Sequence, residues 1–235
     1  MRITIHQPEH LPWLGFFHKM SGADRFVLLD NVQFSKNYFQ NRNKARTADG
    51  WTWLTVPVSR TIDTLIKDVT ISDDFRWKRK WKDTICYAYK KAPYFDKYFE
   101  SIDNVMSNSS NNLCDFNVAL IKCLAGSLNI TTDLIMASEL NSKGSGSDLI
   151  LSICKEVGSS SYVSGISGRN YLKLDEFETA GIDVEFQEFH HPVYKQLYGP
   201  FIPCMSVIDL LFNCGDKSLD IIKGIGVQVM EEVFH

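Results

Sequence analysis

The stretch that decides the fold is Arg2-Ile3-Thr4-Ile5-His6-Gln7-Pro8-Glu9-His10, at the start of the chain. Its first four residues alternate between polar and apolar side chains, and this period of two predicts a short β-strand. Two histidines, a glutamine and a glutamate follow directly, bracketed by Pro8 and Pro12. Polar and titratable groups therefore gather where the first predicted strand ends.

A second strand is expected to end in the same way. The apolar run Phe26-Val27-Leu28-Leu29 predicts a strand, and Asp30-Asn31-Val32-Gln33 follows it at once. Between the two strands, residues 16–22 have the pattern of a short helix closed by a glycine. Because ligands of α/β proteins bind at the carboxyl ends of their strands, both polar groups become candidate site residues.

The rest of the chain indicates an α/β fold with a helical insert. From Thr132 onward, strand and helix patterns alternate over residues 133–137, 148–157, 161–164, 174–180 and 183–189. Such alternation favours a mostly parallel sheet with helices on both faces, Rossmann-like and possibly nucleotidylyltransferase-like. Helical patterns also fill residues 73–130. We expect one α/β domain over residues 1–235 with this helical insert, because no long linker interrupts the chain.

Composition is that of an ordinary globular protein. The 25 Lys and Arg residues against 28 Asp and Glu residues give a net charge of −3, so nothing calls for a nucleic acid or an anionic membrane as partner. The six cysteines form no C-x-x-C pair and are expected to be reduced thiols. Without a signal-peptide pattern or an apolar run of about 18 residues, the sequence predicts a cytoplasmic protein with no membrane insertion.

His6 and His10 are candidate catalytic residues. Imidazole titrates near neutral pH, and Glu9 between the two histidines suits a general acid–base pair. A structural role for each histidine is the alternative. A zinc site is the rival use of these side chains, since enough imidazoles are present, namely His6, His10, His18, His190 and His191. Neither a Cys pair nor an H-E-x-x-H helix is present, so we predict no metal site. The sequence indicates no particular cofactor.

Polar residues around the two strand ends suit a nucleotide-linked sugar. Carboxylate and amide groups bind hydroxyls, and cations bind a diphosphate. We therefore expect Asp30 to act in catalysis or to orient the sugar, unless this segment is an ordinary solvated turn. The expected binding residues of this region are Gln7, Trp13, Asn31, Gln33, Lys36, Asn41, Arg42 and Lys44.

Two later segments add candidates. The loop containing Gly165, Ser167 and Arg169 follows a predicted strand and either wraps a phosphate with its backbone N–H groups or is only a tight connection. Near the C-terminus the candidates are His191, Tyr194, Gln196 and Asp209. Because Asp209 stands among apolar helical residues, it needs a buried partner, for which His6, His10 and Arg42 are the suggested residues.

The helix expected over residues 75–91 carries a basic face. Trp77 and Trp81 are four residues apart and lie on one side of such a helix, while Arg76, Arg79 and Lys80 lie elsewhere on it. The pattern favours an aromatic stripe on the core with a solvated basic face. A phosphate-facing patch is the alternative.

Several motifs resemble the WbqC-like protein family. They are His6-Gln7-Pro8, Pro12-Trp13-Leu14-Gly15, Asp30-Asn31-Val32-Gln33-Phe34, Trp53-Leu54-Thr55-Val56-Pro57-Val58 and Ser206-Val207-Ile208-Asp209-Leu210-Leu211. The resemblance implies that the protein acts in the same pathways as the enzymes of bacterial O-antigen and surface-polysaccharide synthesis. It also implies that the protein transfers glycine or another acyl group to a sugar. The opening strand also resembles the nucleotidylyltransferase and pantothenate-synthetase group, although its histidines have the spacing H-x-x-x-H instead of H-x-G-H.

The expected function is transfer of a small acyl or aminoacyl group to an amino-sugar nucleotide. A nucleotide-linked sugar is thus the expected small-molecule partner. One alternative is ATP-dependent nucleotidyl transfer or adenylate formation. Another is a non-catalytic accessory protein that binds a sugar nucleotide. The sequence leaves the oligomeric state open.

Overall fold

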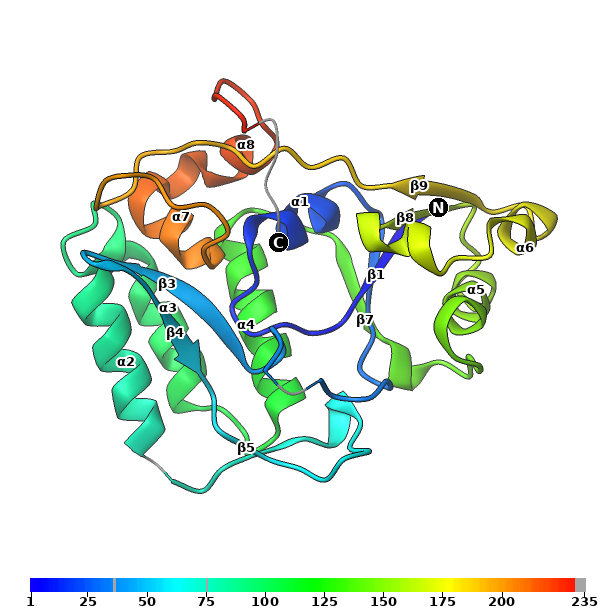
Figure 1. The fold of residues 1–235 in the computed structure, drawn as a ribbon, viewed down its shortest axis with the longest axis horizontal. Helices are drawn as coiled ribbons and strands as arrows, with labels where there is room; N and C mark the ends of the chain where they lie inside the picture. The colour runs from blue at the N-terminus through cyan, green and yellow to red at the C-terminus, as the bar shows by residue number, and fades with distance from the viewer. Residues whose placement is uncertain (36, 75, 231–235) are drawn as a thin grey trace. The chain divides into compact units, whose positions relative to one another are not determined.

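The computed structural model describes residues 1–35, 37–74 and 76–230 (Figure 1). The chain divides into two compact units, between which it passes several times. The first unit comprises residues 1–7, 19–32 and 131–189, and the second comprises residues 8–18, 33–130 and 190–235. That the chain behaves as one domain stays a prediction.

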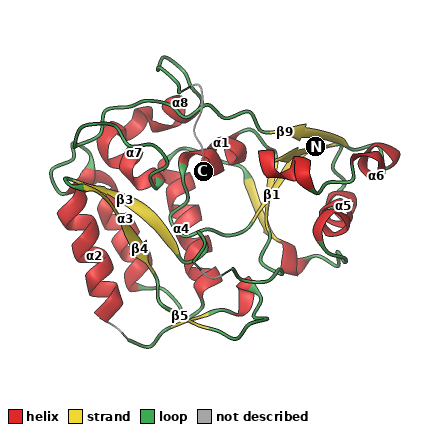
Figure 2. Cartoon of the chain, viewed as in Figure 1, coloured by secondary structure: helices red, strands yellow, loops and turns green. Residues whose placement is uncertain are grey.

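The first unit is built on a five-stranded parallel sheet, drawn in yellow in Figure 2. Its spatial order is β7-β2-β1-β8-β9. The strands are β1 (Arg2–His6), β2 (Arg25–Leu28), β7 (Asp133–Met136), β8 (Ser161–Ser164) and β9 (Asp183–Phe186). All four neighbouring pairs are parallel. The predicted α/β class with a parallel sheet is therefore confirmed.

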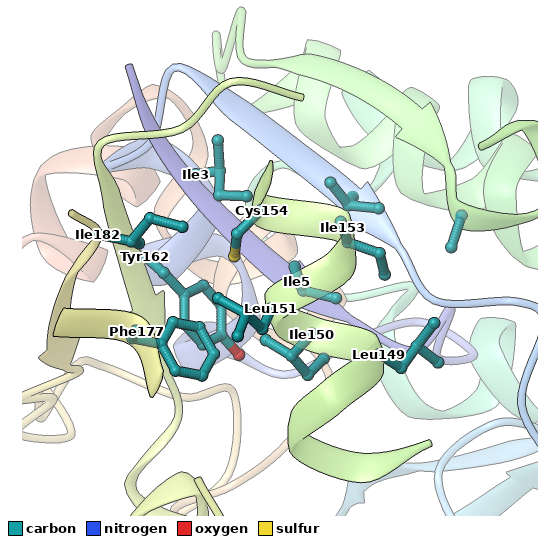
Figure 3. Packing of buried hydrophobic residues seen from close by; sticks show 12 residues of the cluster. Ile3, Ile5, Leu149, Ile150, Leu151, Ile153, Cys154, Tyr162, Phe177 and Ile182 are labelled. Atoms are coloured by element: carbon teal, nitrogen blue, oxygen red, sulfur yellow. The ribbon is translucent and has the colours of Figure 1, made fainter. Parts of the chain in front are cut away.

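Helix α5 (Gly146–Glu156) supplies the core on one face of this sheet. Its residues at spacings of three and four, Leu149, Ile150, Ile153 and Cys154, pack in one cluster with strand residues such as Ile3 and Tyr162 (Figure 3). Burying a large aliphatic side chain contributes about 1.5–3 kcal/mol, so this stripe holds the helix to the sheet. Helix α6 (Leu174–Thr179) adds Phe177, which stacks on Tyr162 with ring centroids 6.0 Å apart.

The second unit combines an antiparallel hairpin with helices. The hairpin strands are β3 (Arg42–Thr47) and β4 (Gly50–Thr55), and a shorter pair consists of β5 (Val58–Ser59) and β6 (Thr70–Ile71). Helix α2 (Arg76–Tyr89) lies alongside the hairpin (Figure 1). The other α-helices that lie wholly among the described residues of this unit are α3 (Phe95–Ser107), α4 (Leu113–Ser127), α7 (Val207–Cys214) and α8 (Ser218–Ile222).

One strand of the second unit differs from the sequence-based prediction, whereas the helical insert agrees with it. Strand β3 was not predicted, because Arg42-Asn43-Lys44-Ala45-Arg46-Thr47 lacks apolar alternation; it pairs in register with the strongly β-prone β4. Helices α2, α3 and α4 lie inside the range of the predicted insert. Helix α1 (Leu14–Ser21) spans one of the boundaries between the units in sequence. No helix in the described part of the chain has the length and apolar character needed to cross a membrane.

Candidate functional site

The sheet of the first unit has a topological switch point between β1 and β8. Counted along the chain, its strands lie in the spatial order third, second, first, fourth, fifth, so the direction of progress reverses beside β1. In open parallel sheets, ligands bind outside the carboxyl ends of the strands at such a reversal. His6 ends β1 and Ser164 ends β8. We call the switch-point site the group at this edge formed by His6, Gln7, Asn31, Gly165, Ser167 and Arg169.

His6 is the titratable group of the switch-point site. Its Nδ1 lies 3.1 Å from the backbone oxygen of Gln7, which can only accept, so Nδ1 carries the proton and Nε2 is the acceptor. Burial, and next the charge of Lys19, lower the pKa of His6 to about 3, although the Gln7 carbonyl acts to raise it. The Lys19 ammonium is itself buried and donates to the oxygen of Ile5. His6 is therefore a neutral imidazole at neutral pH.

Asp30 and Asn31, which follow β2, have different surroundings. Asp30 is buried, and its two carboxylate oxygens accept from the backbone N–H and the hydroxyl of Ser138, at 2.8 and 2.5 Å. This carboxylate thus ties the end of β2 to the turn after β7, and because both of its oxygens are occupied there, Asp30 is not part of the switch-point site. Asn31 donates to the oxygen of Ala137, while its Oδ1 is buried with no hydrogen-bond partner among the described residues. A buried acceptor without a donor is costly, and a ligand hydroxyl would satisfy it.

The loop after β8 is a short 3₁₀-helix, Ile166–Asn170, that begins after Gly165. A Cβ on Gly168 would lie 2.0 Å from the Ser164 hydroxyl oxygen, so this glycine is needed for packing. At Gly165, by contrast, an added Cβ meets open space. Ser167 and Arg169 are exposed, and the Arg169 guanidinium carbon lies 4.9 Å from the ring centroid of Phe186, the last residue of β9. The loop thus carries a cation to the carboxyl edge of the sheet.

His10 belongs to the second unit and is fully buried. Its Nε2 accepts from the indole N–H of Trp81 at 3.0 Å, and its Nδ1 lies 3.2 Å from Oδ1 of Asn117. Burial lowers the pKa of His10 to about 4, although the hydrogen bond to Asn117 acts to raise it. Because both ring nitrogens bind inside the protein, neither is available to a substrate. This geometry therefore does not support the predicted catalytic role of His10.

The side chains of Asn41 and Trp13 make contacts that support the fold. Asn41 is buried and donates from its amide to the oxygen of Val56, at 3.0 Å. Trp13 lies over Gly15, where a Cβ would approach the indole ring within 2.3 Å. This close approach requires glycine at position 15, and it explains the spacing of Trp13 and Gly15.

The exposed face of the hairpin gathers cations and aromatic rings. The Arg42 guanidinium carbon lies 4.2 Å from the Trp53 ring centroid, and the Lys44 ammonium lies 4.8 Å from that of Trp51. Sequence reasoning missed both tryptophans as site candidates, although their spacing of two already placed them on one strand face. Gln33 donates to the oxygen of Ile62 in an exposed turn. The predicted phosphate ligand Lys36 lies outside the described residues.

The C-terminal candidates form part of a buried network in the second unit. Oδ2 of the fully buried Asp209 accepts from the Tyr194 hydroxyl at 2.8 Å and from the Gln196 amide at 2.9 Å. Burial raises the pKa of Asp209 to about 6, although these hydrogen bonds act to lower it. Tyrosine and glutamine thus supply the partners of Asp209, and the suggested pairing with a histidine or Arg42 is wrong. His191 is also buried and accepts from the backbone N–H of Cys204 at 3.1 Å.

Arg46 is a member of this network that the sequence did not point to. It is 1% exposed, and its Nε lies 3.4 Å from Oε1 of Gln196. The rest of the guanidinium donates to the backbone oxygens of Gly50, Tyr198 and Pro200 at 2.6, 3.2 and 3.0 Å. The sequence gives little indication that Arg46 is buried, because β3 also contains Arg42 and Lys44, and nothing in the local pattern distinguishes a buried arginine from a solvated one.

Most of the chain is similar to known proteins. The model of the WbqC-like protein family matches residues 7–221. A protein of Mycobacterium tuberculosis (strain ATCC 25618 / H37Rv), described as uncharacterized protein Rv1507c, is 27% identical over 226 residues, which cover 94% of this chain and 97% of that protein. No solved structure shows a significant match. Because the family model spans most of its length, the chain belongs to the WbqC-like protein family.

Proposed function

We propose that the protein binds a nucleotide-linked amino sugar at the switch-point site and transfers a small acyl or aminoacyl group to the sugar amine, as a step of surface-glycan synthesis. The observation that carries this proposal is the reversal of strand order between β1 and β8. Sheets with this order characteristically hold nucleotides at the reversal. Such a reaction suits a cytoplasmic protein, since nucleotide-linked sugars are made in that compartment.

The residues at this edge have the donors and acceptors that the substrate needs. Backbone N–H groups of the loop from Gly165 to Ser167, together with the Arg169 cation, are suited to a diphosphate. The free acceptor of Asn31 is suited to a sugar hydroxyl, and the Gln7 amide adds a donor and an acceptor. The open space at Gly165 lets a ligand approach the backbone closely.

His6 is the proposed base. The sugar amine attacks the acyl carbonyl carbon, a C–N bond forms, the bond to the leaving group of the acyl donor breaks, and Nε2 of His6 accepts the amine proton. In the free protein this imidazole is a weak base, because burial and Lys19 lower its pKa to about 3. A bound diphosphate opposes the charge of Lys19 and raises this pKa, so binding of the nucleotide strengthens the base.

Thermal unfolding with added nucleotides tests the binding step. UDP-glucosamine, dTDP-linked amino sugars and ATP are compared, since a ligand that binds only the folded protein raises its melting temperature. We expect stabilisation by an amino-sugar nucleotide that weakens in Arg169→Ala. The control is Lys155→Ala, which removes an exposed cation at the last turn of α5, where the chain heads toward the amino edge of the sheet.

Turnover separates the three candidate functions. Acyl transfer predicts an acylated sugar nucleotide that wild type forms and His6→Ala does not, although His6→Ala still binds the nucleotide. Release of pyrophosphate from ATP and Mg²⁺ would favour nucleotidyl transfer instead, and binding without any turnover would favour an accessory protein. If no nucleotide stabilises the wild-type protein, the switch-point proposal fails.

A further inference from the structure

A groove of about 580 Å³ lies within the second unit, between the β3–β4 hairpin and α2. The hairpin lines it with Thr47, Asp49 and Thr52, and the helix lines it with Arg76, Arg79, Lys80, Asp83, Thr84 and Tyr87. These helical residues recur at spacings of three and four and so form one stripe. The neighbouring stripe of α2, which includes Trp77, Trp81 and Ile85, is buried. The amphipathic helix therefore turns its polar stripe toward a groove.

The amino-terminal half of this stripe is basic. Arg76 pairs with Asp74 at 2.8 Å, and Arg79 lies 3.6 Å from Asp83. Ion pairs this exposed contribute little to stability because solvent screens them, so a phosphate dianion can displace them. Lys80 is exposed and makes no ion pair within the described residues. This end of the groove therefore has cations available for an anion.

The other half has the groups that recognise a sugar. Tyr87 is 74% exposed, so its ring offers a bare face for stacking. The half-buried Thr52 can donate a hydrogen bond to a sugar hydroxyl or accept one from it. The carboxylates of Asp49 and Asp83 can accept from sugar hydroxyls, as can Thr84, whose own hydroxyl donates to the Lys80 backbone oxygen at 2.7 Å. An inorganic anion would leave these groups unused. An extended acidic peptide would meet Asp49 and Asp83 as like charges.

We propose that this groove binds a saccharide phosphate, with the phosphate at Arg79 and Lys80 and the sugar ring toward Tyr87. The groove volume lies in the range of small-molecule sites, about 300–1,000 Å³. The inference does not rest on the proposed function, because every lining residue belongs to the second unit while the switch-point site belongs to the first. The groove is thus a saccharide phosphate site in its own right, whatever binds at the switch-point site.

Nuclear magnetic resonance titration of the full ¹⁵N-labelled chain tests this inference. The probes are glucose 1-phosphate and N-acetylglucosamine 1-phosphate, with the unphosphorylated sugars and inorganic phosphate for comparison. We expect saturable shifts at the backbone amides of Thr52, Lys80 and Thr84 with at least one sugar phosphate. Lys80→Gln and Tyr87→Ala are expected to weaken its binding by about tenfold each.

The matched control is Lys90→Gln, which removes the same charge from an exposed position outside the groove. The spectra show whether each variant is folded, and both substitutions leave the buried core unchanged because Lys80 and Tyr87 are exposed. The inference is overturned if neither sugar phosphate binds, if inorganic phosphate binds as tightly, or if Lys90→Gln weakens binding equally. Lys80-dependent binding to phosphatidylglycerol vesicles, without binding of sugar phosphates, would assign the groove to a lipid headgroup instead.

Discussion

The indole N–H of Trp81 donates to Nε2 of His10 at 3.0 Å in the interior of the second unit. On the other side of the imidazole, Nδ1 lies 3.2 Å from the amide oxygen of Asn117. One neutral ring thus joins α2 to α4 and holds the loop that carries His10. Both nitrogens of this imidazole are thus engaged inside the protein, so neither is available for chemistry.

Trp81→Phe tests the structural role of His10. The substitution leaves Nε2 buried without a donor, so we expect the free energy of unfolding to fall by about 1–3 kcal/mol. Urea denaturation of the full chain measures this change. Trp51→Phe, at a tryptophan that is 43% exposed, is the control and is expected to have a clearly smaller effect. Equal losses for the two variants would contradict the bridging role.

Acid is expected to destabilise the protein through its histidines. The pKa of His6 is lowered to about 3 and that of His10 to about 4, from an ordinary value of 6.5. Between pH 4 and 6.5 the unfolded chain therefore binds protons at these rings that the folded chain does not. The free energy of unfolding then falls as the pH falls through this window, by up to about 1.4 kcal/mol per pH unit for each ring. His10→Gln should reduce this slope, as measured by urea denaturation across the window; an unchanged slope would exclude a neutral buried His10.

Asp209 is expected to act in the opposite sense. Burial raises its pKa from 3.8 to about 6, so between these values the folded chain binds more protons than the unfolded chain. Its contribution to stability is complete below the lower value and is lost as the pH rises through the upper one. Asp209→Asn removes this dependence. As the pH rises from 3.8 to about 6, the free energy of unfolding of the variant relative to that of wild type should therefore increase by up to about 3 kcal/mol. A constant difference between the two proteins would refute the raised pKa.

Arg46→Lys probes the buried network around Asp209. An ammonium cannot reproduce the planar fork that reaches the backbone oxygens of Gly50, Tyr198 and Pro200. We expect the free energy of unfolding to fall by about 3 kcal/mol, since buried acceptors lose their donors. Arg60→Lys, at a half-exposed arginine, should change it by less than about 0.5 kcal/mol. Chemical denaturation of both variants checks this, and similar small losses would show that the fork is not needed.

The stacked pair of Arg42 and Trp53 gives a further measurement. With the guanidinium carbon 4.2 Å from the ring centroid, a double-mutant cycle with Arg42→Met and Trp53→Leu should show a coupling of about 0.5–1 kcal/mol. The sequence predicted Arg42 as a phosphate ligand. Nucleotide binding that survives Arg42→Met would leave the arginine with the stacking role alone, whereas loss of binding would restore the predicted one.

The sequence by itself determined the class of the fold and the places where its first two strands end. Strands such as Ile3 to Ile5 and Phe26 to Leu28 carry local periodicity, because each strand must bury one or both faces. That signal needs no knowledge of distant residues. The family motifs are likewise readable without a structure, and the match over residues 7–221 agrees with them.

Only the tertiary structure decided which polar residues face inward. His6 and His10 are four positions apart and look equivalent, but the partners of His10 are Trp81 and Asn117, which lie 71 and 107 positions away. The polar strand β3 and the buried Arg46 likewise depend on neighbours that are remote in sequence, such as Gln196. The physical reason is that burial and hydrogen bonding are set by contacts between distant segments, and a local pattern does not encode them.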